Sequence, residues 1–374
     1  MTQSRTVLVA VSGHGFGHAV RCAEVAGALL RRRARVVLRT DAPRWLFPHE
    51  VEWIDSPGWP LDIGVVQHDG LEMDIAATRE AWRQFAREMP ARAEVEARLL
   101  REAGVDVVVA DVPPLVFAAA ARAGVPSYGM TNFTWDWIYS AWPAFEDIVA
   151  RIRASYATAQ ALLRLPLHSS EASAFLAWRA VEDVPLIARR AKRSRASVRT
   201  DHGLPRDRPV VLLSFGGFTA RGLDVMRLAD SPEYVFVLTP PLANDLRQVP
   251  ANVRIVNPEP ADYVSLLAAC DAVVTKPGYG IVADCLANRV AVLFTDRGPF
   301  REYDVLAEAL PRLGRAQYVP REEILTGNLQ PHLDALMALR TPWTNQPMNG
   351  ADAVAERVLM RVTIELESES EKSR

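Results

Sequence analysis

The chain has 374 residues, of which 49% are hydrophobic and 24% charged, and its formal net charge is −2 at pH 7. This length is suited to two domains, and the composition is that of a soluble globular protein. The slightly negative net charge argues against the basic surface of a nucleic-acid-binding protein. The apolar run at residues 7–11 is too short for a signal peptide or a membrane span, and no later run reaches the ~20 residues of a span.

The three cysteines, Cys22, Cys270 and Cys285, are isolated from one another and have neither a CxxC motif nor the spacing of metal ligands. Isolated cysteines on apolar segments are typical of buried, reduced thiols. We therefore expect a cytoplasmic protein that holds no metal.

Short apolar runs alternate with helical patterns through the first half of the chain. The predicted strands are residues 7–11, 36–38, 105–110 and 125–130. The predicted helices are residues 19–33, 78–103 and 115–123, and another helix extends from the aromatic segment 131–145 to about residue 164. Strands that are apolar throughout must be covered on both faces, so this alternation predicts a parallel sheet with helices on either side.

The second half repeats the pattern, with predicted strands at residues 208–214, 234–239, 253–256, 272–275 and 291–294. We therefore predict an α/β fold of two doubly wound, Rossmann-like domains. They would face each other across a cleft at the carboxyl ends of both sheets, where open α/β sheets bind ligands. The predicted boundaries are 1–182 for the first domain, 183–206 for an arginine-rich linker, 207–348 for the second domain, 349–364 for a last helix and 365–374 for a disordered tail.

The first glycine-rich turn runs from Gly13 to His18 and allows three interpretations. A dinucleotide site such as that for NAD would need a third glycine where His18 stands, so the motif GxGxxG is incomplete. The histidines, His14 and His18, are equally compatible with capping the helix. In the third interpretation one imidazole is a general base, since histidine is suited to removing a proton from a hydroxyl.

Asp111, at the end of the strand 105–110, bears on that choice. Its carboxylate would orient His18 and stabilise the cationic ring, as the third group does in catalytic triads. The alternative is that Asp111 caps the helix that follows Pro113 and Pro114.

The stretch 271–286 is a predicted strand, a turn from Lys276 to Gly280, and a helix that opens at Ile281. The free N–H groups at a helix start form an anion site suited to a phosphate, and glycines at 278 and 280 let the backbone approach a ligand. Lys276 would add a point charge, and Asp284 lies within reach of a ribose. The same residues would also serve an ordinary strand–turn–helix corner.

Other segments leave their roles open. The aromatic segment 131–145 is typical of a core, a sugar-stacking wall, an acceptor pocket or a membrane contact. The basic run 189–195 is typical of a solvated face or a site for anionic acceptors or lipid headgroups. The turn at 215–219 would contact a diphosphate or only reverse the chain. The segment 301–304 begins a helix with carboxylates, which suit sugar hydroxyls as well as a helix start.

Together these motifs resemble the GT-B glycosyltransferases, in particular the family of the peptidoglycan N-acetylglucosaminyltransferase and plant monogalactosyldiacylglycerol synthase, through FGGFT, TKPGYGIVADCLA and FREYDVLAE. A longer resemblance, to the N-terminal glycosyltransferase-like half of plant L-arabinokinase, includes SGHGFGHAVR, ADVPP, TNFTWDWIY, DVPLIARR, SFGG, KPGYGIVADCLA and NGADAVAERV. The kinase activity of that family belongs to a separate C-terminal domain that these motifs do not include. We therefore expect no sugar kinase activity.

The resemblance implies a role for each motif. The second domain would bind a nucleotide sugar, usually a UDP-sugar, and the first domain an acceptor that is a small molecule or lipid-linked. The implied donor residues are Gly216, Gly217, Thr219, Lys276, Gly278, Tyr279 and Gly280 for the diphosphate, Asp284 for the ribose, residues 258–260 for the base, and Arg301, Glu302 and Asp304 for the sugar. The implied acceptor-side residues are Gly15, Phe16, Gly17, Asn132, Trp135 and Asp136.

The catalytic residues implied by the resemblance are His18 as the base and Asp111 behind it, with His14 as the other candidate base. This chain departs from the peptidoglycan family by having histidines at both 14 and 18 and by having Asp284 in place of a glutamate. We predict an inverting glycosyltransferase without metal or other cofactor; peripheral membrane contact and oligomeric state stay open. The alternatives are a nucleotide-sugar epimerase or hydrolase, and a non-catalytic sensor of sugar nucleotides.

Overall fold

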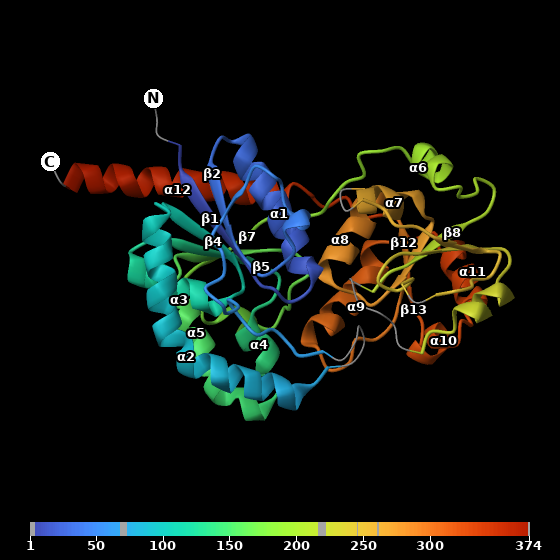
Figure 1. Ribbon diagram of the computed structural model, residues 1–374, viewed down its shortest axis with the longest axis horizontal. Coiled ribbons are helices and arrows are strands. Elements are labelled where there is room, and N and C mark those ends of the chain that lie inside the picture. The colour runs from blue at the N-terminus through green and yellow to red at the C-terminus, as the bar shows by residue number, and fades with distance from the viewer. Residues whose placement is uncertain (1–3, 68–72, 216–221, 245, 260–261, 373–374) are drawn as a thin grey trace. The chain divides into compact units, whose positions relative to one another are not determined.

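The computed structural model describes residues 4–67, 73–215, 222–244, 246–259 and 262–372, with the side chains of 362–372 left out. It divides into two compact units (Figure 1). Unit 1 comprises Met1–Val66, Ile75–Ile187 and Pro347–Arg374, and unit 2 comprises Gln67–Asp74 and Ala188–Gln346. Within the described chain, no helix combines the length and apolar character that crossing a bilayer requires.

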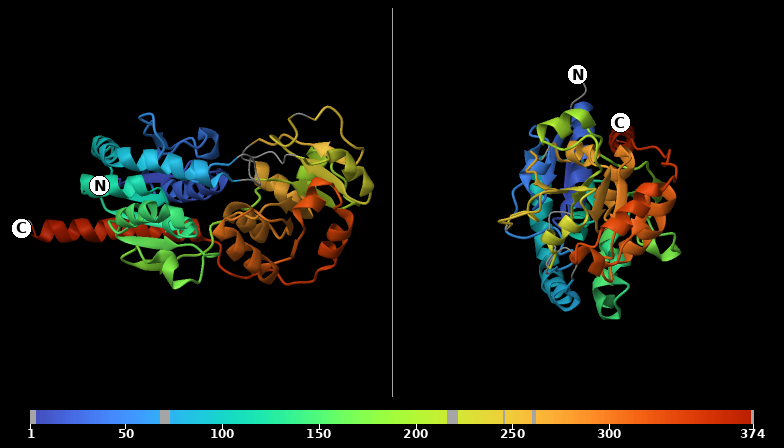
Figure 2. Two further views of the ribbon diagram at one scale, coloured as in Figure 1. Left: turned by 90° about the horizontal axis from the view of Figure 1, so that it is seen from below. Right: turned by 90° about the vertical axis from the view of Figure 1, so that its right-hand side faces the viewer.

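Unit 1 is built on a parallel sheet in the order β3-β2-β1-β4-β5-β6-β7. Its strands are β1 (Thr6–Val11), β2 (Arg35–Arg39), β3 (Glu52–Trp53), β4 (Val107–Asp111), β5 (Ser127–Thr131), β6 (Ala161–Arg164) and β7 (Val181–Asp183). Its helices are α1 (Phe16–Arg31), α2 (Ile75–Glu102), α3 (Pro114–Ala123), α4 (Trp135–Tyr139), α5 (Glu146–Tyr156) and α12 (Gly350–Lys372). Helices α1 and α12 pack together, and α2, α3 and α5 form a second group (Figure 2).

The two helix groups of unit 1 cover opposite faces of its sheet because crossovers between parallel strands are right-handed. From β1 the chain moves outward to β2, and from β4 it moves outward in the other direction to β5. Right-handed connections in opposite directions place α1 on one face and α3 on the other. The central strands β1 and β4 are therefore buried along their whole length, as their unbroken apolar sequences predict.

Unit 2 repeats this arrangement with a parallel sheet in the order β10-β9-β8-β11-β12-β13. Its strands are β8 (Val210–Leu213), β9 (Val235–Leu238), β10 (Val253–Ile255), β11 (Ala272–Thr275), β12 (Ala291–Phe294) and β13 (Ala316–Tyr318). Its helices are α6 (Arg195–Asp201), α7 (Tyr263–Ala269), α8 (Tyr279–Asn288), α9 (Arg301–Leu313), α10 (Arg321–Leu325) and α11 (Gln330–Ala338). Alternate residues of the inner strands, such as Val211 and Leu213, form one core with Leu333 and Leu336 of α11.

The structure corrects three expectations. The helix predicted to reach residue 164 breaks at Pro143, which cannot continue a helix, and residues 161–164 become β6 beside β5. The predicted linker 183–206 is divided between the units, since α6 packs against α7 and belongs to unit 2. Helix α12 continues to Lys372 through most of the tail expected to be disordered, because glutamate and lysine favour a helix.

Several arginines of the predicted linker pair with carboxylates. Arg199 lies 2.6 Å from Asp271, which also accepts a hydrogen bond from Arg195, and Arg193 pairs with Asp201. A cation that already has a carboxylate partner contributes little to binding an external anion. These ion pairs favour a structural role for the basic run over a lipid or acceptor site.

The last helix, α12, belongs to unit 1, and the segment just before it contacts the segment that precedes unit 2. Ile187 and Asn349 form an antiparallel bridge, and the N–H of Gly350 donates to the carbonyl of Leu186 at 3.1 Å. Asp352 then pairs with Arg32 of α1 at 2.6 Å. The segments before and after unit 2 are therefore neighbours within unit 1.

We predict that Gly350→Ala destabilises unit 1, because an added Cβ would lie 2.1 Å from the carbonyl oxygen of Pro185. A clash with backbone costs about 1–3 kcal/mol, which should lower the melting temperature by several degrees. Gly27→Ala is the control: its Cβ would meet Arg31 at an ordinary 3.6 Å, and alanine stabilises a helix interior. Equal melting temperatures for the two variants would contradict the prediction.

Candidate functional site

The chain of unit 1 reverses direction across its sheet between β1 and β4. From β1 it proceeds to β2, and from β4 it proceeds to β5 on the opposite side. The loops after β1 and β4 therefore diverge at the carboxyl edge, where open α/β sheets bind ligands. Asp111 pairs in register with Val11, so it lies next to the start of the glycine-rich turn 13–18.

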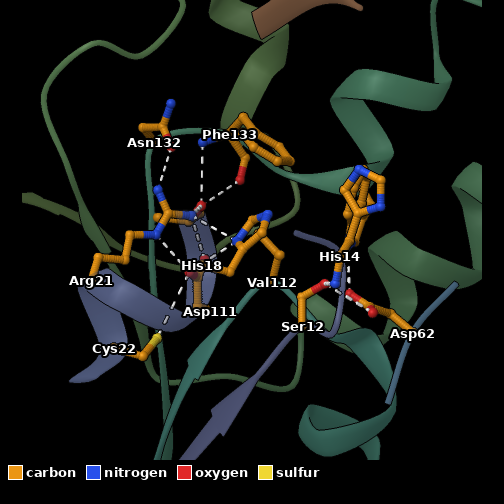
Figure 3. A network of polar contacts seen from close by, with 12 residues as sticks. Ser12, His14, His18, Arg21, Cys22, Asp62, Asp111, Val112, Asn132 and Phe133 are labelled. Atoms are coloured by element: carbon orange, nitrogen blue, oxygen red, sulfur yellow. Dashed lines mark hydrogen bonds and ion pairs between the residues drawn. The ribbon is translucent and has the colours of Figure 1, made fainter. Parts of the chain in front are cut away.

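The structure brings His18 and Asp111 together at this edge (Figure 3). Gly15 ends the loop with a φ of 76° that favours glycine, and α1 begins at Phe16. His18 thus falls in the first turn of α1, where its Nδ1 lies 3.0 Å from Oδ2 of Asp111. His18 is 6% exposed and Asp111 is fully buried. Helix capping by Asp111 is not observed, since the N-cap of α3 is Pro113.

Arg21 completes this cluster and was missed from the sequence. It lies one helical turn after His18 on α1, and residues three apart share a helix face. Its Nε and Nη2 donate to the two oxygens of Asp111 at 2.5 and 2.6 Å, which is the bidentate geometry of strong arginine–carboxylate pairs. The same Nη2 lies 3.0 Å from Nδ1 of His18. The spacing of His18 and Arg21 after a glycine-rich turn is the signal that would have identified it.

The charges of the cluster determine how the histidine is held. Burial acts against the charge of Asp111, but Arg21 and His18 outweigh it and lower the pKa of this carboxyl to about 2. Asp111 is therefore an anion and only accepts hydrogen bonds, whereas Arg21 only donates them. In the tautomer with the proton on Nδ1, His18 donates to Asp111 and Nε2 is the nitrogen that can take a proton from a ligand.

Asn132, predicted on the acceptor side, supports Arg21 instead. Its Oδ1 accepts from Nη1 of Arg21 at 2.7 Å, and its Nδ2 donates to the carbonyl of Leu167 at 3.3 Å. Thr131 accepts from Nη2 of Arg21 at 3.1 Å. The end of β5 is thus joined to α1 and β4 by one buried network.

His14, the other candidate base, has a different environment. Its Nδ1 accepts from the N–H of Val65 at 3.4 Å, and its ring meets Trp135 edge to face at 5.5 Å. A Cβ on Gly64 would lie 2.6 Å from the His14 ring, so glycine at 64 makes room for it. Nδ1 of His18 lies 3.0 Å from a carboxylate oxygen of Asp111.

Asp62 is a second buried carboxylate near the two histidines, and it is not among the residues predicted from the sequence. It accepts from Ser12 at 3.0 Å and from the indole of Trp135 at 2.8 Å (Figure 3). Burial raises the pKa of Asp62 to about 6, although these hydrogen bonds act to lower it. Asp62 therefore changes its charge near pH 6, where Asp111 does not.

The aromatic segment is mainly core, one of the roles left open. Trp135, Trp137 and Tyr139 are buried, and Trp135 stacks on Tyr139 at 5.3 Å. Asp136, predicted on the acceptor side, is buried and accepts from Arg153 of α5 at 3.0 Å. Oδ2 of Asp136 is therefore engaged by a contact within unit 1.

The start of α1 is more open. Among the described residues, a Cβ on Gly17 would meet no heavy atom within 4 Å. Phe16 is half-buried and contacts the exposed Trp45 edge to face at 5.5 Å. Phe16 and Gly17 are thus less closely packed than Asn132, Trp135 and Asp136, which were also predicted on the acceptor side.

In unit 2 the turn from Lys276 to Gly280 lies at the equivalent position, because the chain diverges from β8 and β11 as it does from β1 and β4. Helix α8 begins at Tyr279, two residues before the predicted start, and Gly278 is its N-cap. Gly278 has an ordinary extended backbone, and a Cβ there would first meet Arg297 at 3.9 Å. Among the described residues, neither conformation nor packing demands this glycine.

Asp284 has a partner that the sequence did not indicate. It is 2% exposed and accepts from the backbone N–H of Arg189 at 2.8 Å and from its Nε and Nη2 at 3.0 and 2.6 Å. Asn288, one turn later, donates to the carbonyl of Arg189 at 2.9 Å. Asp284 thus fixes the start of unit 2 against α8, and a ribose would have to share its carboxylate.

The structure describes only some of the remaining residues that were predicted to bind the nucleotide sugar. Glu302 is buried and pairs with Arg297 at 2.9 Å, whereas Arg301 is half-buried and Asp304 is exposed at the start of α9. Lys276 is 7% exposed, and Tyr279 and Gly280 are buried in the first turn of α8. Gly216, Gly217 and Thr219 lie outside the described residues, as does Pro260 at the end of the segment predicted to meet the base.

We predict that Asp62 makes the protein less stable as the pH rises from about 4 to about 6. Its folded pKa is raised, so the folded state retains a proton that the unfolded state has lost, and stability falls with rising pH by roughly 3 kcal/mol over this window. Asp62→Asn should remove this slope in urea unfolding. Ser12→Ala, which deletes a bond that lowers the pKa, should extend the slope to higher pH; parallel curves for all three proteins would contradict the assignment.

Comparison with known proteins gives one curated relative. No family model matches the chain. L-arabinokinase of Arabidopsis thaliana is 32% identical over 375 residues, which cover 97% of this chain and 35% of that protein. The chain thus spans about a third of the length of this relative and is similar to it over nearly all of its own.

Solved structures establish the fold. SnogD, a glycosyltransferase from Streptomyces nogalater, has a TM-score of 0.57 at 18% identity, covering 96% of this chain and 100% of that one. UGT89C1 of Arabidopsis thaliana in complex with quercetin has a TM-score of 0.62 at 15% identity, covering 98% of this chain and 99% of that one. Its complex with UDP has a TM-score of 0.55 at 13% identity, covering 96% of this chain and 95% of that one. MurG of Acinetobacter baumannii has a TM-score of 0.58 at 15% identity, covering 95% of this chain and 99% of that one. The chain has the GT-B glycosyltransferase fold that its sequence predicts, with two parallel-sheet α/β domains.

Proposed function

We propose that the chain is a glycosyltransferase that moves a sugar from a UDP-sugar to an acceptor hydroxyl with inversion of the anomeric carbon. The observation that carries the proposal is the buried contact between His18 and Asp111, 3.0 Å long, at the carboxyl ends of β1 and β4. In a GT-B fold this contact provides a base beside an edge of the sheet that binds ligands. The fold neighbour UGT89C1, solved with UDP and with quercetin, supports a nucleotide donor and a small hydroxylated acceptor.

The proposed reaction is a direct displacement. Nε2 of His18 takes the proton of the acceptor hydroxyl while the hydroxyl oxygen bonds to the anomeric carbon. The bond from that carbon to the diphosphate oxygen breaks, and its electron pair leaves with UDP. Because the acceptor attacks the face opposite to the diphosphate, the anomeric configuration inverts.

The leaving diphosphate would be stabilised by unit 2. Backbone N–H groups at the start of α8 and the ammonium of Lys276 would be donors for the negative charge that develops on the departing oxygen. Gly278 would let the phosphates reach these groups. The charge is then balanced by protein groups, and the proposal requires no metal.

We predict that Gly278→Ala weakens the binding of UDP at least tenfold, because the new methyl would occupy the space of the diphosphate. This equals about 1.4 kcal/mol of binding free energy and is measurable by isothermal titration calorimetry. The melting temperature without ligand should be unchanged, since the methyl makes only an ordinary contact with Arg297. Gly27→Ala in α1 is the matched control. Equal affinity of all three proteins for UDP would show that the diphosphate does not lie against this turn.

We predict that His18→Gln lowers sugar transfer by about 10²–10⁴-fold, the usual contribution of a general base, while the affinity for UDP stays the same. The assay follows the release of UDP from UDP-glucose, UDP-galactose and UDP-N-acetylglucosamine with hydroxyl acceptors such as quercetin. His14→Gln is the matched control and should retain most of the activity. If His14→Gln is the inactive variant and His18→Gln is active, His14 is the base.

The same assay separates the alternative functions. Product analysis that finds a changed sugar still attached to UDP identifies an epimerase, and free sugar without an acceptor product identifies a hydrolase. A UDP-sugar that binds without any turnover identifies a sensor. A protein that binds neither UDP nor any other nucleoside diphosphate is incompatible with all of these functions.

A further inference from the structure

The loop after β12 brings an arginine next to the glycine turn before α8. Strands β11 and β12 are parallel, with Thr275 opposite Phe294, and Gly278 and Arg297 each lie three residues beyond these partners. The two loops therefore leave the sheet at the same edge. A Cβ on Gly278 would meet Nη1 of Arg297 at 3.9 Å. The guanidinium thus lies beside the turn at which the diphosphate is proposed to bind.

Arg297 is held in this position from two sides. Gly298 has a φ of 73°, which favours glycine and turns the chain. The guanidinium then lies over the ring of the buried Phe300, 4.2 Å from its centre. Its Nη1 donates to Oε2 of Glu302, in the first turn of α9, at 2.9 Å. Because these contacts already fix the side chain, little of its entropy remains to be lost when a ligand binds.

The hydrogen bonds within unit 2 use only a small part of what this guanidinium can donate. The contact with Glu302 is a single hydrogen bond, whereas a guanidinium has five N–H donors. Among the described residues, the buried Nε of Arg297 has no hydrogen-bond partner. Arg199 differs in this respect, since its Nε, Nη1 and Nη2 all donate to groups of unit 2. Arg297 therefore retains donors for an anion, and Arg199 does not.

The charge of Arg297 is also only partly compensated. Its side chain is 12% exposed, so water screens the charge less than it would at the surface. Burial lowers the pKa of Arg297, and the charge of Glu302 offsets only part of this effect, although the guanidinium stays protonated. A buried cation with one carboxylate partner is stabilised by a further anion.

We propose that Arg297 binds the distal phosphate of the nucleotide sugar, which is the phosphate that carries the sugar. This inference rests on the proposed nucleotide-sugar donor. Arg297 adjoins Gly278, which would face the diphosphate, and contacts Glu302, whose implied ligand is the sugar. The phosphate between these two positions is the distal one. During transfer the negative charge on the departing oxygen develops on this phosphate, where a fixed guanidinium stabilises it.

The test compares UDP with UMP, which lacks the distal phosphate, by isothermal titration calorimetry of the full chain. Arg297→Met alone would remove the arginine partner of the buried Glu302, which is destabilising, so the main variant also carries Glu302→Gln. This double variant should bind UDP about tenfold to a hundredfold more weakly than Glu302→Gln alone, the usual loss for a hydrogen bond to a charged group. Its affinity for UMP should equal that of Glu302→Gln.

The single variant Glu302→Gln should have the opposite effect on UDP. It removes a negative charge from beside the phosphate and leaves the guanidinium in place, so UDP should bind more tightly than to the wild-type protein. If the pair of Arg297 and Glu302 only holds the loop, loss of either partner should instead weaken the binding of UDP. If the double variant does not fold, Glu302→Gln therefore decides: unchanged or weaker binding of UDP would overturn the inference.

Two further results would also overturn it. The double variant and Glu302→Gln could bind UDP equally well, or the double variant could lose as much affinity for UMP as for UDP. If Gly278→Ala still weakens the binding of UDP in either case, the diphosphate site stands without Arg297. A wild-type protein that binds no UDP contradicts both the proposed function and this inference. Binding of UDP that depends on Arg297, without any transfer of sugar, supports the inference and contradicts the proposed transfer.

Discussion

The ion pair between Arg21 and Asp111 is the contact on which the organisation of unit 1 depends. It joins the first turns of α1 to the end of β4, and through Asn132 and Thr131 it reaches the end of β5. A buried pair of this kind is costly unless each partner is satisfied, and here both carboxylate oxygens and all three guanidinium nitrogens have acceptors or donors. The same pair holds His18 in place. The hydrogen bonds that connect α1, β4 and β5 at this edge of the sheet therefore also position the proposed base.

Much of the fold was accessible from the sequence because the relevant signal is local. Strands such as β1, β4, β11 and β12 are apolar runs buried on both faces, and their predicted bounds differ from the structure by two residues at most. The alternation of such runs with helices indicates a parallel sheet without further information. Strands β6 and β7 are short elements at one end of the sheet, where β6 pairs with β5 and β7 pairs with β6. Their conformation depends on this pairing, which no local sequence pattern expresses.

Only part of the candidate site could be predicted from the sequence, because only part of its signal is local. His18 and Asp111 were found because each follows a strand, and parallel strands bring their carboxyl ends together. Arg21, Asp62 and Arg189 have partners 90, 73 and 95 residues away in the chain. Their importance arises from three-dimensional contacts between charges, and the sequence around each is ordinary. Asp284 shows the consequence, since it was assigned to a ligand although a distant arginine already binds it.

The return of α12 to unit 1 has a consequence for synthesis of the chain. Residues 188–346, which make up nearly all of unit 2, are contiguous, so their sheet can form as soon as they leave the ribosome. Unit 1 emerges first, but its α1 surface is covered by a helix that begins only at Gly350. At 5–20 residues per second, the roughly 160 intervening residues take about 10–30 s. During that interval the apolar side of α1 is exposed to solvent, and exposed apolar surface promotes aggregation. The nascent first unit is therefore the part of the protein for which protection by chaperones matters most.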